Sequence, residues 1–250
     1  MQKDFCQQKN SMKLDILIVM AHPDDAELSC SGTIISSVSS GKKVGIIDLT
    51  KGEMGTRGNS KIRISEANDS AKLMKIKFRE NLGLKDAFFE NNEKNKLLLV
   101  KKIREYRPKI IITNSFEERH PDHEKASRLV YDASFLSGLE KVSSKYRGKI
   151  QKKWKPNFIL YSLQDKYIKP DFVIDVSKFY NKKIKAIKCF KSQFYNNNSK
   201  ESESYISTKN FLDFINSRSI ELGHSIGVNH GEGFISSKSN IGFKDLFSIL

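Results

Sequence analysis

Apolar residues along this chain gather into short runs that alternate with segments of helical spacing. In the first half, runs with the length and composition of buried strands stand at residues 14–20, 44–49 and 109–114. Helical periodicity or helix-stop signals mark the segments between and after them, at residues 29–40, 62–77, 93–106 and 124–137. Strands that alternate with helices of this length indicate parallel βαβ crossovers. The pattern predicts an α/β fold, with a Rossmann-like, mostly parallel sheet and helices on both of its faces.

The second half of the chain is less regular. Strands are expected at residues 158–163 and 171–176, and helices at residues 178–193 and about 208–222. Residues 141–156 are polar and basic, which indicates a connection or a surface insertion, and residues 195–204 have the composition of a mobile loop. There is no internal repeat and no convincing linker. We therefore expect one domain over residues 13–250, preceded by a disordered extension at residues 1–12.

The composition excludes several classes of protein. A chain of 250 residues with 38% hydrophobic residues can bury a core over most of its length. No apolar run reaches the length of a membrane span, and residues 1–13 lack the apolar core of a secretory signal. Cys6, Cys30 and Cys189 form no CxxC motif, which argues against a disulfide framework. We therefore expect a cytoplasmic protein that does not associate with membranes.

The formal net charge of +15 raises the question of a nucleic-acid partner. The excess is mostly lysine, spread along the chain among many Asn, Ile and Ser residues, and a compositional drift produces the same pattern. The densest basic stretch, residues 178–191, places Ile184, Ile187 and Phe190 between its lysines. This spacing is typical of an amphipathic helix with a solvated lysine face, and an anion-binding patch is the alternative. We therefore predict no nucleic-acid partner.

Two short clusters of histidine and aspartate follow two of the predicted strands. The first cluster is AHPDDAE at residues 21–27, and the second is RHPDH at residues 119–123. Ligands of open α/β sheets gather at the carboxyl ends of the strands, where both clusters are expected. Histidine and aspartate at such a position are the side chains that an open, hydrolytic metal site requires.

Three residues of these clusters are the candidate metal ligands. His22 and Asp25 lie three residues apart in a strand-to-helix turn, and His123 completes the set from the other strand end. Two histidines and one carboxylate leave a fourth position open, as in catalytic zinc sites, although Fe²⁺ accepts the same donors. We therefore predict one metal ion per chain, zinc or alternatively iron. Without the second cluster, Asp24 and Asp25 would be read only as an N-cap for the helix that follows.

The remaining polar residues of the clusters are candidates for the catalytic chemistry. Asp24 is not needed as a ligand and is placed to act as general base toward the attacking water. His120 can stabilise the oxyanion as an imidazolium, and Asp122 can hold that imidazole in orientation. Glu27 is a weaker candidate, because a glutamate in the first turn also complements the helix dipole.

These motifs resemble the LmbE-like, or PIG-L, family of zinc-dependent N-acetylglucosaminyl deacetylases. The resemblance covers residues 13–250 and includes AHPDDAE (21–27), DLT (48–50), GEMGTRG (52–58), Arg63 with Glu66-Ala67, Arg107-Pro108, HPDH (120–123), PDFVID (170–175), KSQF (191–194), IGV (226–228) and GEGF (231–234). It implies an LmbE-like fold. The later motifs resemble the branch that deacetylates N-acetylglucosaminyl malate in bacillithiol biosynthesis.

The resemblance implies the same roles for the two clusters and adds substrate contacts. It makes the loop from Glu53 to Gly58 a substrate-contacting loop and Arg63 a sugar- or carboxylate-binding residue. An arginine fork also suits a dicarboxylate such as malate on chemical grounds alone. Glu53, Arg57 and Arg63 are therefore the predicted substrate-binding residues, with a solvated loop arginine as the alternative for Arg57. The resemblance also implies a homo-oligomer, either a trimer or a hexamer.

The chain departs from the family pattern at His230, where relatives carry a tyrosine before GEGF. His230 either donates a hydrogen bond at the mouth of the active site or only packs. The sequence as a whole predicts a cytoplasmic, zinc-dependent amidohydrolase that converts N-acetylglucosaminyl L-malate to glucosaminyl malate and acetate. The alternatives are a deacetylase of other N-acetylglucosamine conjugates or chitooligosaccharides and, more remotely, a basic nucleic-acid-binding module on the same fold.

Overall fold

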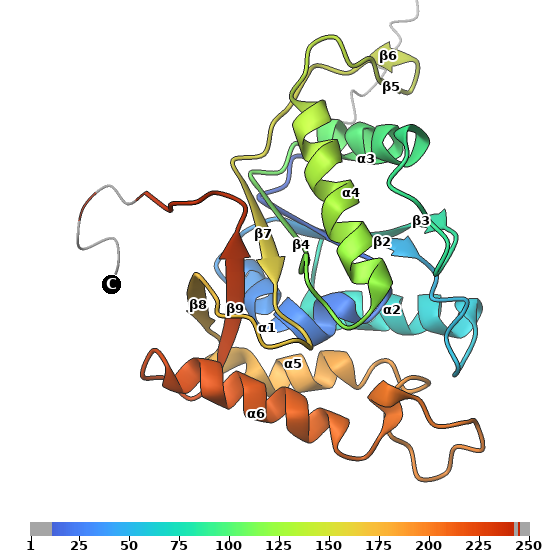
Figure 1. Cartoon of the computed structure of the whole chain (residues 1–250), viewed down its shortest axis with the longest axis vertical. Helices are drawn as coiled ribbons and strands as arrows, with labels where there is room; N and C mark the ends of the chain where they lie inside the picture. Colours follow the sequence, from blue (N-terminus) through green and yellow to red (C-terminus); the bar gives the residue numbers. More distant parts are fainter. Residues whose placement is uncertain (1–11, 243–244, 246–250) are drawn as a thin grey trace, which may run out of the picture.

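A seven-stranded sheet forms the centre of the molecule, shown in Figure 1 as a computed structural model that describes residues 12–242 and 245. The strands are β1 (Ile16–Met20), β2 (Val44–Thr50), β3 (Phe78–Leu84), β4 (Ile110–Asn114), β7 (Phe158–Ser162), β8 (Phe172–Asp175) and β9 (Gly231–Ser236). Their order in the sheet is β3-β2-β1-β4-β7-β9-β8. The first five strands in this order are parallel to one another, and β9 is antiparallel to both β7 and β8. The prediction of a mostly parallel α/β sheet is confirmed.

Helices cover both faces of this sheet. They are α1 (Asp25–Ser39), α2 (Ser60–Met74), α3 (Glu93–Tyr106), α4 (Pro121–Ser137), α5 (Tyr180–Ile187) and α6 (Phe211–His224). Leu17 and Val19 of β1 pack against α3 and α4 on one face, whereas Ile16 and Ile18 pack with α1, α2 and α5 on the other. A strand buried on both faces needs apolar residues at every position, which is why the central strands stand out as apolar runs.

Two strands of the sheet have no counterpart in the apolar pattern. β3 has the sequence FRENLGL and lies at the edge of the sheet, where most of its residues are half-exposed. β9 contains Gly231, Glu232 and Gly233 and is buried, so it lacks the alternation expected of a half-buried strand. Both strands depend on neighbours that are distant in the sequence, so local periodicity does not reveal them.

The polar stretch at residues 141–156 contains a small hairpin, which Figure 1 shows at the periphery of the molecule. Its strands are β5 (Lys145–Tyr146) and β6 (Lys149–Ile150). Arg147 and Gly148 form the turn, both with positive φ (48° and 76°), as the tight turn of a hairpin requires. The extension predicted at residues 1–12 lies, apart from Met12, outside the described residues.

The helix predicted at residues 178–193 is shorter than expected, and one of its lysines is buried. A 3₁₀ turn, η1 (Ser177–Phe179), precedes α5, which ends at Ile187. Lys183 is only 3% exposed, and its Nζ lies 2.7 Å from Oε1 of Glu232. The prediction of a solvated face is therefore wrong for Lys183, because a buried carboxylate on β9 compensates its charge.

Glu232 in turn stabilises a bend in α1. Cys30 has non-helical backbone angles (φ −143°, ψ 16°) that divide α1 into two parts. The carboxylate of Glu232 accepts hydrogen bonds from the freed backbone N–H groups of Gly32 (2.9 Å) and Thr33 (2.7 Å). It thus acts as a cap for the second part of the helix. A side chain at Gly32 would collide with Val176, which follows β8, and with Glu232 of β9, so the close approach of these two residues requires glycine there.

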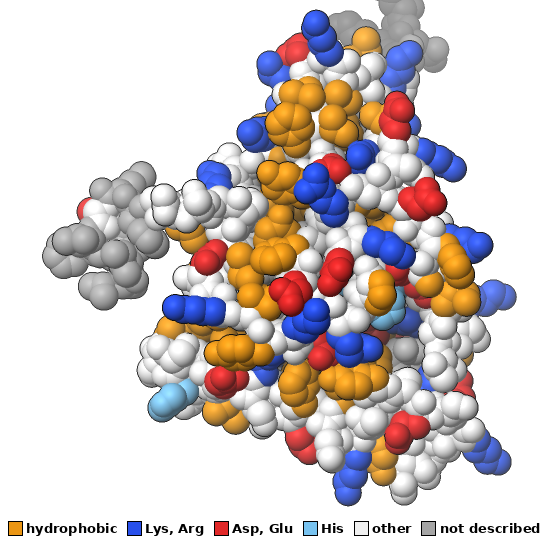
Figure 2. All heavy atoms as spheres, in the orientation of Figure 1, with side chains coloured by type: hydrophobic (Ala, Val, Ile, Leu, Met, Phe, Trp, Pro, Cys, Tyr) orange, Lys and Arg blue, Asp and Glu red, His pale blue; other side chains and the backbone are white. Residues whose placement is uncertain are grey.

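Two further features concern the distribution of charge on the surface and the length and polarity of the helices. Lys and Arg side chains are scattered over the face seen in Figure 2, interspersed with Asp and Glu, rather than gathered into one basic patch. None of the helices within residues 12–242 combines the length and the apolar character needed to cross a lipid bilayer.

Candidate active site

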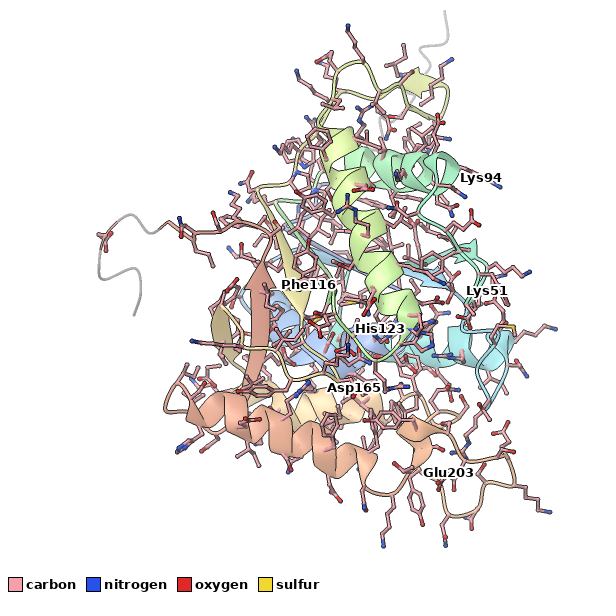
Figure 3. All side chains as sticks on the ribbon, viewed as in Figure 1. Lys51, Lys94, Phe116, His123, Asp165 and Glu203 are labelled. Carbon is pink, nitrogen blue, oxygen red and sulfur yellow. The ribbon has the colours of Figure 1, made fainter. Side chains whose placement is uncertain are left out.

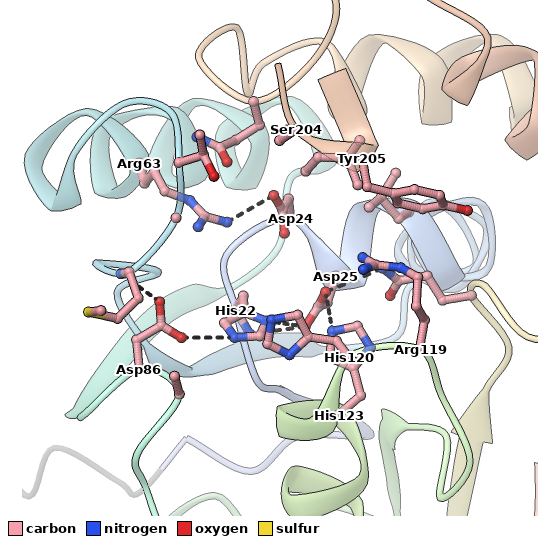
Figure 4. Close-up of a pocket in the computed structure, with 18 residues that line it drawn as sticks. His22, Asp24, Asp25, Arg63, Asp86, Arg119, His120, His123, Ser204 and Tyr205 are labelled. Atoms are coloured by element: carbon pink, nitrogen blue, oxygen red, sulfur yellow. Dashed lines mark hydrogen bonds and ion pairs between the residues drawn. The ribbon is translucent and has the colours of Figure 1, made fainter. Parts of the chain in front are cut away.

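The carboxyl ends of the parallel strands open into one cavity of about 420 Å³. His22, Asp24 and Asp25 follow β1, and His120 and His123 lie at the start of α4, which follows β4. Figure 4 shows His22, Asp25, His120 and His123 pointing toward one another, with Asp24 next to Arg63. Figure 3 places His123 and Asp165 together at the end of the sheet that faces α5 and α6. The two sequence clusters therefore meet at one site.

The three predicted metal ligands converge around the carboxylate of Asp25. Its Oδ2 lies 3.5 Å from Nδ1 of His22, and its Oδ1 lies 3.1 Å from Nε2 of His123. Asp25 also accepts hydrogen bonds from the backbone N–H of His22 (3.0 Å) and from Nδ2 of Asn114 (3.1 Å). All four residues are buried. Burial opposes ionisation, yet the charge and hydrogen bond of His123 hold the pKa of Asp25 well below its usual range.

These donors fit a divalent metal ion. Ring nitrogens of His22, His120 and His123 lie within 4.8 Å of one another, and Asp25 contacts two of these histidines. Nε2 of His123 faces Asp25, whereas its buried Nδ1 forms no hydrogen bond within the described residues and lies 3.9 Å from Oε2 of Glu118. Imidazole and carboxylate donors in this arrangement suit Zn²⁺ or Fe²⁺. His120, predicted only as a catalytic side chain, is thus close enough to be counted with the candidate ligands.

Two further carboxylates lie close to Nε2, the other ring nitrogen of His22. Nε2 of His22 lies 3.0 Å from Oδ1 of Asp86 and 3.4 Å from Oδ2 of Asp122. Because Nδ1 of the same ring faces Asp25, these carboxylates are placed as the outer partners that orient a metal-binding histidine. Oδ2 of Asp86 also accepts a hydrogen bond from the backbone N–H of Met54 (2.9 Å). Asp86 follows β3, the strand that the sequence pattern does not reveal, and it was therefore missed.

Asp122 contacts His120 differently from the prediction. Its carboxylate lies beside His22 and accepts hydrogen bonds from the backbone N–H of Ala87 (2.8 Å) and from Lys125 (3.1 Å). Only its backbone N–H reaches the imidazole, donating to Nδ1 of His120 over 3.2 Å. The expected orientation of His120 by the Asp122 carboxylate is wrong in this geometry, because the first turn of α4 directs that carboxylate toward β1.

His120 and Asp24 have shifted pKa values. Burial, together with the nearby His22 and His123, lowers the pKa of His120 to about 4, so its imidazole is neutral at pH 7. Burial raises the pKa of Asp24 to about 7, although the guanidinium of Arg63 favours the ionised form. A carboxyl group that titrates near neutral pH is suited to general acid–base work.

Asp24 is held in a strained conformation beside Arg63. Its φ of 113° lies in a region that side chains rarely adopt, and such strain is commonly found at functional sites. Nη2 of Arg63 donates to Oδ2 of Asp24 (2.9 Å) and to the carbonyl of Pro23 (2.6 Å), while Nη1 donates to the carbonyl of Gly52 (3.2 Å). Arg63 lines the cavity, but these donors are directed at the protein.

The other two predicted substrate-binding side chains do not line the cavity. The carboxylate of Glu53 accepts hydrogen bonds from the backbone N–H groups of Asp86 (2.9 Å) and Lys51 (3.2 Å). Arg57 is 5% exposed, and its Nη1 donates to the carbonyl of Phe194 (3.4 Å). The loop does reach the cavity, but through the residues between them, Met54, Gly55 and Thr56.

Several residues that line the cavity were not among the predicted ones. They are Asp86, Arg119, Gln164, Gln193 and Tyr205. The guanidinium of Arg119 packs 4.1 Å from the ring centroid of Tyr205, and Nε of Arg119 lies 3.1 Å from Asp165. Arg119 directly precedes the HPDH motif, which was an available signal. Tyr205 begins the short 3₁₀ turn η2 (Tyr205–Ser207) after a loop of polar composition, where no pattern marks it.

His230 packs outside the cavity. Its ring stacks on Tyr180 with centroids 3.6 Å apart and planes 3° from parallel. Its backbone N–H donates to Oγ of Ser177 (3.0 Å). Of the two roles considered for His230, the structure favours packing.

Comparisons with known proteins agree with this geometry. The family model PIG-L: GlcNAc-PI de-N-acetylase matches residues 17–134, a range that contains both clusters. A diacetylchitobiose deacetylase from Thermococcus kodakarensis is 28% identical over 189 residues, which are 72% of this chain and 70% of the relative.

Solved structures show the same fold. The conserved protein TT1542 from Thermus thermophilus superposes with a TM-score of 0.82 at 28% identity, covering 92% of this chain and 98% of that one. The N,N'-diacetylchitobiose deacetylase from Pyrococcus horikoshii superposes with a TM-score of 0.76 at 24% identity, covering 88% of this chain and 82% of that one. These comparisons show that the chain is similar to PIG-L-type de-N-acetylases and shares the fold of the solved relatives, in agreement with the two motifs that meet at one cavity.

Proposed function

We propose that this protein is a metal-dependent deacetylase that hydrolyses the acetamide group of an N-acetylglucosamine-type substrate. The main support is the buried group of His22, Asp25 and His123, with Asp24 beside it in a cavity of about 420 Å³. The family match over both clusters and a relative named as a deacetylase support the same activity.

The residues of the cavity suggest how this hydrolysis proceeds. A divalent metal ion held by His22, Asp25 and His123 would supply the Lewis acid that polarises the acetamide carbonyl. Asp24, whose pKa is raised to about 7 by burial, takes a proton from the attacking water and returns it to the leaving amine. Arg63 holds the carboxylate of Asp24 in place through its 2.9 Å hydrogen bond.

His120 is placed to stabilise the tetrahedral oxyanion. Its Nδ1 accepts a hydrogen bond from the backbone N–H of Asp122, which assigns the proton of the neutral ring to Nε2. Nε2–H is then a donor for the negative charge that develops on the acetamide oxygen. A neutral imidazole is sufficient for this role, so the imidazolium expected from the sequence is not required.

N-acetylglucosaminyl L-malate is the substrate that we favour, which would place the enzyme in bacillithiol biosynthesis. The later sequence motifs support this choice, and so does Arg119, a half-exposed cation at the cavity that could bind a malate carboxylate. Because Arg63 is engaged with Asp24, carboxylate recognition is better assigned to Arg119. A chitooligosaccharide is the alternative, supported by the Thermococcus kodakarensis relative that is named for diacetylchitobiose.

An acetate-release assay with defined metals tests this proposal. The protein is stripped with a chelator, reloaded with Zn²⁺ or Fe²⁺, and offered the malate conjugate and diacetylchitobiose in parallel. We expect acetate release that depends on metal, with the higher kcat/KM for the malate conjugate. A preference for diacetylchitobiose would favour the alternative substrate. No release from any N-acetylglucosamine conjugate with either metal would contradict the deacetylase, and metal-free DNA binding with a steep salt dependence would favour the nucleic-acid module.

We propose a cytoplasmic enzyme without a nucleic-acid partner, assembled as a trimer or hexamer. Light scattering on the purified chain measures the oligomeric state, and a monomer at assay concentration would contradict it.

A further inference from the structure

Gln193 belongs to the KSQF motif, which the proposed chemistry does not use. The motif follows α5, and Gln193 lines the cavity while being only 4% exposed. It lies against the loop at residues 52–58, where both Gln193 and its neighbour Phe194 form hydrogen bonds with Arg57. A buried amide in a cavity wall raises the question of which of its two ends faces the cavity.

The hydrogen bonds around Gln193 determine the orientation of its side-chain amide. Nε2 donates to the carbonyl oxygen of Arg57 (2.7 Å) and to Oγ of Ser192 (2.9 Å). The backbone carbonyl oxygen of Arg57 can only accept a hydrogen bond. The hydroxyl of Ser192 gives its own hydrogen to Oε2 of Glu66 (2.7 Å), so toward Gln193 it also acts as an acceptor. A flipped amide would set Oε1 against two acceptors, and the observed orientation is therefore required.

Glu66 reinforces this arrangement from α2. Its Oε1 accepts the backbone N–H of Ser192 (2.8 Å), while Oε2 accepts the hydroxyl of the same residue. Glu66 is itself 9% exposed, so the pair is shielded from competing water. The chain of contacts from Glu66 through Ser192 thus holds the Nε2 end of Gln193 away from the cavity.

The side-chain carbonyl oxygen of Gln193, Oε1, is free to accept a hydrogen bond from a ligand. Both hydrogens of Nε2 are engaged, and no group in the described part of the chain donates to Oε1. Oε1 lies on the side of Gly55, a residue that lines the cavity, because a Cβ built on Gly55 would stand 3.9 Å from it. Leaving a nearly buried acceptor unpaired costs free energy, so this oxygen favours the binding of a ligand that carries a hydrogen-bond donor.

We propose that Gln193 is a specificity-determining residue that accepts a hydrogen bond from one hydroxyl group of the sugar substrate. Ser192 and Glu66 are positioning residues that act through Gln193. This inference rests on the proposed deacetylase function and narrows it to substrates that carry a hydroxyl at one particular position. A site built to bind a hydroxyl discriminates against the analogue that lacks it, because its own polar group is then left without a partner.

The test combines the substitution Gln193→Met with substrates that each lack one sugar hydroxyl. Methionine has a similar length and no acceptor of comparable strength. On the parent substrate we expect the variant to lose about tenfold in kcat/KM, the size of one neutral hydrogen bond. For the one analogue that lacks the partner hydroxyl, wild type and variant should have equal kcat/KM, because the hydrogen bond is already absent. The inference is overturned if the variant loses the same factor on every analogue, or loses nothing on any.

Two further variants separate recognition from folding. Gln151→Met makes the same chemical change beside the hairpin, outside the cavity, and should leave all kinetic constants unchanged. Ser192→Ala keeps Gln193 and removes one of the two acceptors that orient it, so it should show the same analogue pattern with a smaller loss. Metal content is measured for every variant. If wild type releases no acetate, the proposed function fails; if wild type is active and the analogue pattern is uniform, only the role of Gln193 fails.

Discussion

The floor and the wall of the cavity are built in different ways. The floor consists of His22, Asp24, Asp25 and His123, buried side chains that follow the central strands β1 and β4. The wall consists of the loop at residues 52–58 and the segment at residues 192–206. In the floor, side chains contact one another directly, whereas in the wall most contacts involve backbone groups.

Charged residues consequently play different parts in the two regions. In the floor, the charges of Asp25 and Asp24 are directed into the site. In the wall, Arg57 is directed at the carbonyl of Phe194, and Glu201 accepts the backbone N–H of Gly58 (2.9 Å). Arg57 and Glu201 therefore stabilise the wall, whereas Asp24 and Asp25 line the cavity and remain available for the chemistry.

The largest effect is expected from Asp24→Asn, in the floor. The variant keeps the shape of the side chain and removes the base, so kcat should fall by about 10²- to 10⁴-fold. Metal content should stay unchanged, because the Asp24 carboxylate faces Arg63 rather than the three ligands. Acetate release and metal analysis on the same sample check both expectations. Asp69→Asn, at an exposed position of α2, is the matched control, and a variant of Asp24 that retains more than a tenth of wild-type kcat would contradict the role of base.

Asp86→Asn tests the connection between the floor and the wall. Oδ1 of Asp86 orients His22, and Oδ2 of Asp86 accepts a hydrogen bond from the backbone N–H of Met54. Loss of an outer carboxylate on a metal-binding histidine weakens metal affinity by about 10- to 100-fold. Competition with a chelator of known affinity measures the change. Asp132→Asn, which replaces a carboxylate on α4 far from the cavity lining, should bind metal as tightly as wild type, and equal affinity in both variants would show that Asp86 does not support the site.

The sequence predicts the floor well because short motifs carry it. β1 is apolar throughout and β4 begins with three isoleucines, and both motifs follow these strands closely, so the parallel fold alone brings His22 and His123 together. Asp86 escapes prediction because β3 is a polar edge strand. The sequence does not predict the orientation of the Asp122 carboxylate either, because this orientation depends on the direction in which the first turn of α4 faces.

The sequence predicts the wall less well for a physical reason. The GEMGTRG loop lines the cavity through Met54, Gly55 and Thr56, but which of its side chains face inward depends on backbone contacts with a segment far along the chain. Arg57 binds the carbonyl of Phe194, and Gln193 binds the carbonyl of Arg57. A backbone carbonyl is present at every residue, so no residue type signals these partners. Gln193 belongs to the KSQF motif, but the motif does not indicate the role of its side chain.

Arg119→Ala should reduce selectivity rather than the chemistry. Arg119 lies at the cavity with a half-exposed guanidinium, and Asp165 contacts its Nε. If its other nitrogens bind the malate carboxylate, the variant should lose about tenfold in kcat/KM for the malate conjugate, as expected for a charged hydrogen bond. For diacetylchitobiose, which has no carboxylate, we expect little change. Equal losses on both substrates would remove the argument for carboxylate recognition by Arg119.

Arg57→Ala should have the smallest effect on activity and should not distinguish the two substrates. The guanidinium of Arg57 is buried against the carbonyl of Phe194, so its removal should destabilise the fold by about 1–3 kcal/mol. The change in kcat/KM should be modest and equal for the malate conjugate and diacetylchitobiose, because no substrate contact is lost. Chemical denaturation measures the stability, and Arg147→Ala, in the turn of the peripheral hairpin, serves as the control. A selective loss on the malate conjugate at unchanged stability would instead make Arg57 a substrate-binding residue, and the wall would then resemble the floor in presenting its charges to the cavity.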